Sequence, residues 1–371
     1  MIIFLFTLTS CTEKIDKSFK TDTAEITEDT PNPNRDRFVV YSLPYDENLQ
    51  QASTWGTMLL TQDRVLSDTG TRFQMGRSPT GSIRFHRSGN FGYVAQDDGS
   101  VGAFEIDADG VVSVIYEAFS SAAYAEAVYT VDDTLYIIDP NWPGNGGGIY
   151  RADIDPHDGT LSEPSLWIST KLAKEITPFD NGFLLLAMDC ENSAEGQEVH
   201  YIGEDGYAYS VDAFADTDSF LSSISLNRSQ NTLFVADNSE FGPQDNRVGI
   251  LSVSEESITA DSVLSPLLDP IDIIASPLSD DVAVISGYGN AVYLLDDDYR
   301  SFTELSYIGA APQLPGQAGM ITTGDLQGTI VLAENQGVRL LAFESDGLVD
   351  YGLTSLGSGS TSIVGAIGIQ P

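Results

Sequence analysis

The stretch YIIDPNWPGNGGGIYRADIDPHDGT, residues 136–160, indicates the fold because it contains one complete strand–loop–strand–turn phrase. An apolar strand leads into a loop rich in Pro and Gly, and a second, alternating strand ends at Asp158-Gly159. The glycine cluster lacks the G-x-G-x-x-G spacing of a phosphate loop, because Ile149 takes the third glycine's place and a strand follows. The acidic run departs from an EF-hand calcium loop, because Gly159 comes one place late. Both features are therefore predicted to be turns.

The same phrase returns along the chain at a spacing of roughly 43 to 50 residues, the period of a four-stranded propeller blade. Its six openings are Phe91, Leu135, Phe183, Leu233, Val282 and Ile330. Short apolar strands precede most of them, at residues 82–85, 126–130, 222–226, 272–276 and 319–323. Asp/Gly pairs predict tight hairpins between third and fourth strands at 109–110, 158–159, 205–206 and 346–347. Because no long 3.6-residue periodicity occurs, very little helix is expected.

The two ends of the body supply the strands of one further blade. Residues 362–369 form an inner strand with no partners after it, whereas three strands near residues 38–69 lack an inner strand. Pairing these segments closes the ring and removes exposed sheet edges. We therefore predict an all-β, seven-bladed β-propeller over residues 36–371, closed by its N- and C-terminal strands, with six and eight blades as the alternatives.

These phrases resemble the lactonase-type β-propellers, the YVTN-containing superfamily that includes bacterial 6-phosphogluconolactonase-like proteins. The resemblance rests on LYIIDP at 135–140, LFVADN at 233–238, the strands that follow them and the DGTL hairpin at 158–161. The tetrapeptide Y-V-T-N itself does not occur. The resemblance implies a seven-bladed propeller, with lactone hydrolysis as the activity of some of its members.

The N-terminus, MIIFLFTLTSC, is predicted to be a bacterial lipoprotein signal. Its apolar run ends in Leu8-Thr9-Ser10-Cys11, which resembles a lipobox, so residues 1–10 would be removed and Cys11 lipidated. No Lys or Arg precedes the run, and the run is too short to span a bilayer. Residues 11–35 are predicted to be a disordered acidic tether. We therefore expect an exported protein attached to the cell envelope, at the outer membrane or cell surface, only through its lipid.

The charge of the chain excludes several classes of partner. It has 17 basic and 55 acidic residues, which gives a net charge of −38. Such a surface repels nucleic acid and anionic lipid, so neither is expected to bind. Lysine is scarce, since only Lys171 and Lys174 occur after Lys20. We expect the protein to be a monomer.

A candidate metal site is predicted at the mouth of the propeller channel, where the loops after the second strands meet. The residue at this position is acidic in most units, and such a ring suits Ca²⁺ or another hard cation. Its members are Asp97, Asp139, Asp189, Asp237 and Glu334. One of these carboxylates could instead activate water against a lactone. The plainer alternative is that Asp caps the backbone where a strand becomes a loop.

Two long loops at the same mouth carry the predicted ligand-binding residues. Each loop contains an aromatic residue among Pro and Gly, which makes a platform for a small molecule, glycan or partner protein. The predicted set is Asp139, Trp142, Asp237, Phe241 and Arg247. The alternative for the tryptophan is packing over the neighbouring blade.

Other residues argue against two kinds of chemistry. The arginines Arg72, Arg77 and Arg247 are too scattered to hold a phosphorylated sugar, and no three histidines are placed to bind zinc. We therefore favour a non-enzymatic, envelope-anchored protein that binds a ligand or protein at its acidic mouth. The alternative is a hydrolase of an uncharged lactone that uses a carboxylate or a bound divalent metal.

Overall fold

The computed structural model describes residues 34–120, 123–140, 147–188, 197–203, 206–214, 221–238, 246–265, 267–296 and 298–371. The chain divides into two units, Met1–Thr30 and Pro31–Pro371, and every described residue belongs to the second. The predicted signal, Cys11 and most of the tether lie outside the described residues and stay predictions. In the part of the chain that is described, no helix is long and apolar enough to cross a membrane.

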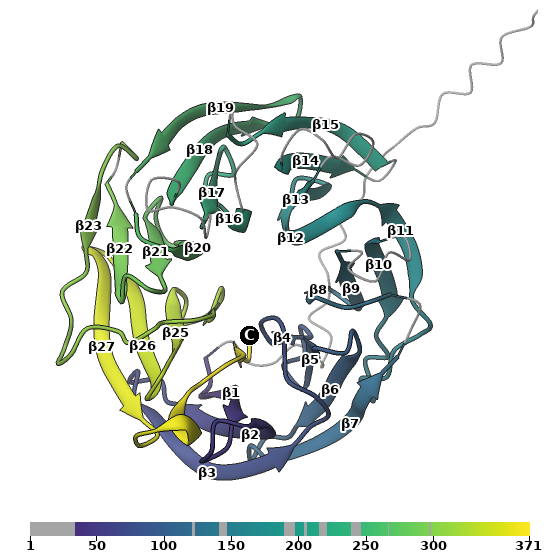
Figure 1. Ribbon diagram of the computed structural model, residues 1–371, viewed down its shortest axis with the longest axis vertical. Helices are drawn as coiled ribbons and strands as arrows, with labels where there is room; N and C mark the ends of the chain where they lie inside the picture. Colours follow the sequence, from purple (N-terminus) through teal and green to yellow (C-terminus); the bar gives the residue numbers. More distant parts are fainter. Residues whose placement is uncertain are drawn as a thin grey trace, which may run out of the picture. The chain divides into compact units, whose positions relative to one another are not determined.

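Seven four-stranded antiparallel sheets surround one axis, so the seven-bladed all-β propeller is confirmed (Figure 1). In order from the axis outward, the first blade consists of β28 (Ile367–Ile369), β1 (Arg37–Tyr45), β2 (Gln51–Leu60) and β3 (Leu66–Gln74). The second blade consists of β4 (Arg84–Phe85), β5 (Phe91–Ala95), β6 (Val101–Ile106) and β7 (Val112–Phe119). The third consists of β8 (Ala127–Val131), β9 (Thr134–Asp139), β10 (Gly148–Asp153) and β11 (Ser165–Ser169).

The remaining four blades follow in chain order. The fourth consists of β12 (Lys171–Phe179), β13 (Gly182–Met188), β14 (Gln197–Gly203) and β15 (Gly206–Asp212). The fifth consists of β16 (Leu221–Leu226), β17 (Thr232–Asp237), β18 (Arg247–Ser254) and β19 (Ser257–Leu264). The sixth consists of β20 (Pro270–Ala275), β21 (Val282–Ser286), β22 (Ala291–Leu295) and β23 (Phe302–Glu304). The seventh consists of β24 (Ala318–Met320), β25 (Thr329–Glu334), β26 (Gly337–Glu344) and β27 (Gly347–Ser355), and a 3₁₀ turn, η1 (Ser360–Ser362), follows it.

The ring is closed by pairing between the last and first strands. β28 runs antiparallel to β1, with Val39 opposite Ile369 and Tyr41 opposite Ile367. The Gln370 side chain adds two bonds, because its Oε1 accepts from the Phe38 amide at 2.9 Å and its Nε2 donates to the Gly89 carbonyl at 2.7 Å. The C-terminal segment therefore joins the first blade to the second as well as completing the first.

The second strand of each blade is buried on both faces, which explains its continuous apolar sequence. Every residue of β5, β21 and β25 is buried, whereas the outer strand β19 is mostly exposed. Neighbouring blades pack face to face, and the buried side chains form seven clusters, one between each pair of adjacent blades. The core is therefore a ring of interfaces, and loss of one blade would expose two of them.

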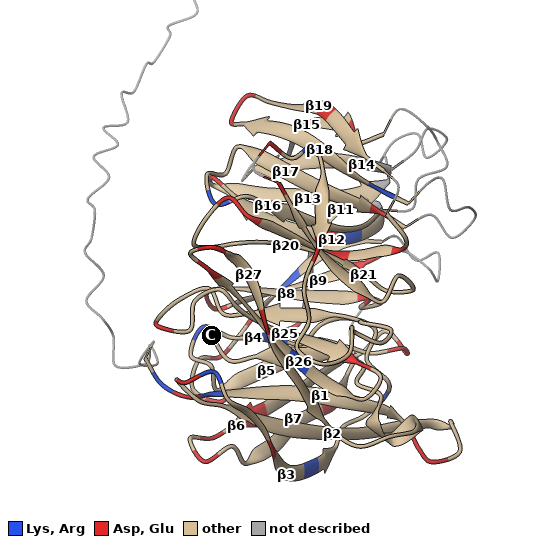
Figure 2. Ribbon diagram, turned by 90° about the vertical axis from the view of Figure 1, so that its left-hand side faces the viewer, with Lys and Arg blue, Asp and Glu red and all other residues tan. Residues whose placement is uncertain are grey.

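The glycines of the predicted Asp/Gly pairs lie between third and fourth strands, where the sequence predicts them. These glycines adopt positive φ angles of 79° at Gly110, 70° at Gly159, 108° at Gly206 and 110° at Gly347. These angles lie in the left-handed half of backbone space that residues with a Cβ avoid. Acidic residues recur on the loops and basic residues are sparse (Figure 2).

Truncating a buried side chain of the closing strand β28 should destabilise the whole ring. Ile367 is fully buried in the cluster between the seventh and first blades, so Ile367→Ala should lower the free energy of unfolding by about 2–5 kcal/mol. Ile308→Ala is the control, because Ile308 is 64% exposed and its loss should change stability by less than about 0.5 kcal/mol. Urea unfolding measures both; equal effects of the two variants would contradict closure through β28.

Candidate functional site

Three of the predicted mouth carboxylates, Asp139, Asp237 and Glu334, are buried within the blades. Asp139 and Asp237 are fully buried at the ends of β9 and β17. Asp139 Oδ2 accepts the Tyr124 amide at 3.0 Å, and Asp237 Oδ2 accepts Arg247 Nε at 2.8 Å. The Arg247 guanidinium in turn lies 4.2 Å from the centre of the Phe214 ring. These two carboxylates therefore bind groups of the protein itself.

A polar side chain near the end of the second strand has the same role in several blades. It bonds to the segment that leads into the first strand of its own blade. The pairs are Ser42 with the Ala366 amide, Gln96 with the Arg77 amide, Asp139 with the Tyr124 amide, Ser286 with the Leu268 carbonyl and Glu334 with the Gln313 amide. These side chains therefore cap backbone groups, which is the alternative to metal binding that the sequence analysis offered for this position. The capped backbone belongs to the segment that enters the first strand.

The other members of the predicted sets do not join these residues. Asp97 is exposed, and its amide donates to the Ser78 carbonyl at 2.8 Å. Asp189, Trp142 and Phe241 lie outside the described residues, so their assignments stay predictions. Among the residues that the structure describes, no group of three or more Asp, Glu, His or Cys side chains could hold a metal ion. The predicted calcium ring is therefore not brought together in the described part of the chain.

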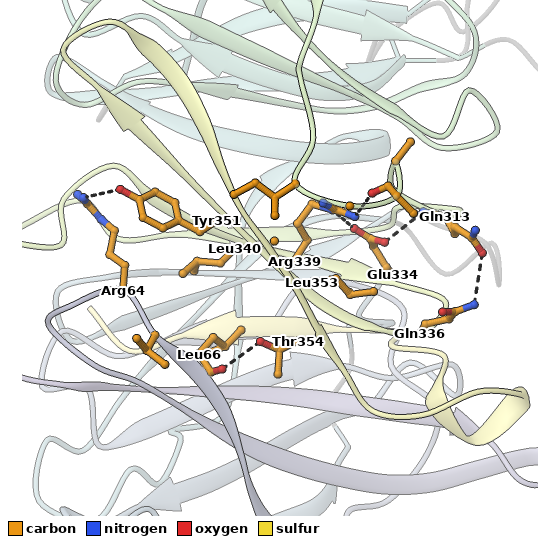
Figure 3. Close-up of a pocket in the computed structure, with 16 residues that line it drawn as sticks. Arg64, Leu66, Gln313, Glu334, Gln336, Arg339, Leu340, Tyr351, Leu353 and Thr354 are labelled. Atoms are coloured by element: carbon orange, nitrogen blue, oxygen red, sulfur yellow. Dashed lines mark hydrogen bonds and ion pairs between the residues drawn. The ribbon is translucent and has the colours of Figure 1, made fainter.

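Glu334 lies on the wall of a cavity of about 530 Å³ formed by segments of the seventh and first blades (Figure 3). Arg339 extends between two carboxylates there, with Nε 2.5 Å from Glu334 Oε1 and Nη1 2.8 Å from Asp350 Oδ2. Its Nη2 donates to the Ala310 carbonyl at 2.8 Å. All three charged side chains are at most 3% exposed. Arg64, the other charged residue in the lining, is paired with Glu344 at 2.7 Å, so each described charged group of this cavity has a partner within the protein.

A second cavity, of about 540 Å³, occupies the central channel and is lined mainly by residues of the first strands and the segments that enter them. Its lining reaches the end of the second strand β9, because it includes Ile138, next to Asp139, and Glu126, whose amide donates to the Ile138 carbonyl. The six titratable residues in this lining are Arg84, Glu126, Tyr129, Lys174, Glu175 and Asp272. The volume lies in the range of ordinary small-molecule sites.

Two carboxyl groups in the channel come from alternate blades. Glu175 lies on β12 and Asp272 on β20, and Ser223 of the intervening β16 lies between them. Ser223 Oγ donates to Asp272 Oδ1 at 3.1 Å, and the Ile224 amide donates to Glu175 Oε2 at 2.8 Å. Burial and then the neighbouring Glu175 raise the pKa of Asp272 to about 7, and burial raises the pKa of Glu175 as well. This pair can therefore hold a proton at neutral pH.

The cations of the channel face these carboxyl groups. Arg84 on β4 opposes the rise in both carboxyl pKa values, and its guanidinium lies 5.2 Å from the centre of the Tyr129 ring. Burial lowers the pKa of Lys174, and the carboxylate of Glu126 partly opposes that change. The channel thus combines acids, bases and an aromatic ring in the lining of one cavity, as functional sites commonly do.

Charged residues within the first strands are a sequence signal for this site, and the prediction of a site at the channel mouth does not use them. Arg84, Glu175 and Asp272 interrupt short apolar first strands, and Lys174 is one of the few lysines in the body. First strands surround the axis, so a charged residue on one of them can face the channel. The strand register decides which side chains of a first strand face the channel, and the sequence does not specify it. In the structure, for example, Glu175 of β12 pairs with Leu186 of β13.

Comparison with known proteins supports the fold and goes no further. No protein-family model matches the sequence, and no curated protein matches it significantly. The periplasmic gluconolactonase PpgL of Pseudomonas aeruginosa is similar in structure, with a TM-score of 0.61, 11% identity, and coverage of 89% of this chain and 98% of that one. A candidate 6-phosphogluconolactonase of Bacteroides fragilis has a TM-score of 0.60 at 12% identity, over 91% of this chain and 99% of its own. A hypothetical selenium-binding protein of Sulfolobus tokodaii has a TM-score of 0.64 at 10% identity, over 91% and 94% of the two chains.

Removing Arg339 should show that Glu334 is a structural residue. Arg339→Met leaves two buried carboxylates without a counter-charge and should lower the free energy of unfolding by about 3–5 kcal/mol. The triple variant Arg339→Met/Glu334→Gln/Asp350→Asn should recover most of that loss, because it removes the stranded charges. Urea unfolding at pH 7.5 measures both, with the exposed Arg300→Met as control. An Arg339→Met protein within about 1 kcal/mol of wild type would contradict this role.

Asp272→Asn should stabilise the protein at alkaline pH. The folded-state pKa of Asp272 is about 7, against an ordinary value of 3.8, so its contribution to stability is complete below about pH 4 and is lost as the pH rises through 7. At pH 8 the variant should melt about 2–5 °C above wild type, and this difference should shrink between pH 7 and pH 4. Scanning calorimetry across pH measures this, with the exposed Glu304→Gln as control. A lower Tm than wild type at pH 8 would contradict the raised pKa.

Proposed function

We propose that this protein is an exported β-propeller that binds a small polar ligand in its central channel. The observation that carries the proposal is the group of Arg84, Glu175 and Asp272, which three different blades contribute to the lining of one cavity. Charged groups held in such a space destabilise a fold unless they are compensated, and an apolar channel would avoid that penalty. Their presence is best explained by a ligand that they recognise.

The size of the cavity favours a small molecule as the occupant. A volume of about 540 Å³ suits a sugar-sized or smaller compound and is too small for a folded partner. The net charge of −38 disfavours nucleic acid as a partner, because an acidic surface repels the phosphate backbone. Trp142 and Phe241, which the sequence predicts as a platform for a glycan or partner protein, lie outside the described residues and stay predictions.

Export is part of this proposal and has two supports. One is the signal-like N-terminus with its lipobox at Leu8–Cys11. The other is the likeness of the fold to a gluconolactonase that is periplasmic. Lipid attachment at Cys11 would hold the propeller at the envelope while its channel stays open to solutes.

Lactone hydrolysis is a second candidate function. The observation that favours it is that Asp272, whose pKa is raised to about 7, interacts with the Arg84 guanidinium. A general base works best when its pKa lies near the working pH. In this reaction the Asp272 carboxylate accepts a proton from water while the water oxygen bonds to the lactone carbonyl carbon. Arg84 stabilises the oxyanion, the ring C–O bond then breaks, and Asp272 returns the proton to the departing alkoxide.

A ligand screen with a blocked channel tests the binding proposal. Thr177 lines the channel beyond Glu175, so Thr177→Trp should fill the cavity and reduce the affinity for any channel ligand by at least about tenfold. Thr303→Trp, on the exposed outer strand β23, is the matched control and should bind normally. Thermal shift followed by titration calorimetry with lactones, polyols, hydroxy acids and amines measures this.

The same samples also separate the two candidate functions. Lactone ring opening that is lost in Asp272→Asn would establish hydrolysis, whereas binding without turnover would leave a binding protein. If every ligand of the wild type binds equally to Thr177→Trp, the channel is not the site.

A further inference from the structure

The channel carries one more acidic group than it has cations to balance. Its lining contains three carboxyl groups, those of Glu126, Glu175 and Asp272, and two cations, Arg84 and Lys174. Lys174 interacts with Glu126, and Arg84 interacts with both Glu175 and Asp272. One guanidinium therefore serves two carboxylates, and one negative charge lacks a partner when both are ionised.

Two polar atoms of the same channel also lack partners among the described residues. Gln317 Oε1 is shielded from solvent and accepts no hydrogen bond there, and its Nε2 is directed to the Thr80 carbonyl at 3.5 Å. Arg84 Nε is likewise shielded and donates to no described acceptor. A buried polar atom without a hydrogen bond destabilises a protein, so both atoms fit a site that a ligand completes.

These features together define the chemistry of the occupant. An N–H donor with positive charge would balance the extra carboxylate and bond to Glu175, Asp272 or Gln317. An acceptor on the same molecule would meet Arg84 Nε. The Tyr129 ring on the neighbouring β8 already packs against the Arg84 guanidinium, 5.2 Å from the ring centre, and so helps to hold that cation in place. A bare divalent ion fits less well, because Ca²⁺ requires six to eight oxygens and the described residues offer no cluster of three acidic, His or Cys side chains.

We propose that the channel ligand is a small primary amine that also carries a hydrogen-bond acceptor, with its ammonium group held between Glu175 and Asp272. This inference rests on the proposed function, because it names the ligand class of the same channel. The ammonium supplies the charge that a proton on the carboxyl pair supplies in the free protein. Binding at neutral pH therefore releases a proton from that pair.

Titration calorimetry of the full chain with three two-carbon probes of similar size tests this. Ethanolamine carries an ammonium and a hydroxyl, ethylene glycol is its neutral counterpart, and glycolate carries a negative charge. Ethanolamine should bind at least about tenfold more tightly than either of the others at pH 7.5. Titrations in two buffers of different ionisation enthalpy should detect the released proton. The affinity for ethanolamine should fall about tenfold per pH unit below pH 7 and level off above pH 8.

Variants assign the effect to the channel carboxyls. Asp272→Asn and Glu175→Gln should each weaken ethanolamine binding by at least about tenfold and abolish proton release, while Glu304→Gln should bind as wild type does. Circular dichroism and the Tm of each variant confirm that it folds. One outcome would overturn the proposal of an amine ligand and leave the proposal of channel binding intact. It is that ethylene glycol or glycolate binds more tightly than ethanolamine and that Thr177→Trp abolishes this binding. Failure of all three probes would also overturn the amine proposal, and binding of other screened ligands that Thr177→Trp does not weaken would overturn channel binding itself.

Discussion

The pairing of β28 with β1 is the interaction on which the rest of the structure depends. Each blade packs against two neighbours, and the side chains between blades form a closed series of clusters with no free face. That series closes only because the three residues of β28, near the C-terminus, pair with β1, more than 300 positions away in the sequence. Contacts so distant in the chain form late and slowly, since a long loop must first be ordered. Closure also fixes the positions of the first strands and hence the shape of the channel.

The second strands show how the same device serves several blades with different chemistry. A serine, a glutamine, an aspartate or a glutamate near the end of this strand bonds to the segment entering the first strand. Hydrogen bonds to a buried charged group are among the stronger ones in proteins, so the acidic versions hold this segment firmly. Asp139 and Glu334 therefore serve the architecture at this position, and the charged groups that line the channel have a different origin.

Much of the fold could be predicted from the sequence, because it depends on local signals that repeat. The spacing of the phrases, the Asp/Gly turns and the unpaired strands at both ends each agree with the structure. The site was harder, because Arg84, Glu175 and Asp272 are isolated charges in short strands. Which face of such a strand meets the axis depends on the register and on ring closure, and neither is a local property. Asp139 and Glu334 end the second strands β9 and β25, but their burial and their partners depend on the connecting segments and on Arg339, which no local signal in the sequence shows.

The arrangement of Glu175, Ser223 and Asp272 on three consecutive blades has a consequence for how this protein can evolve. In a propeller a given position in one blade lies beside the same position in the next, so a side chain that faces the axis touches its own counterparts. Substitutions in this row should therefore be strongly non-additive, because each residue determines which neutral or charged form its neighbour can keep. Among homologues these three positions should covary as a set, while the apolar residues on the other face of the same strands drift independently.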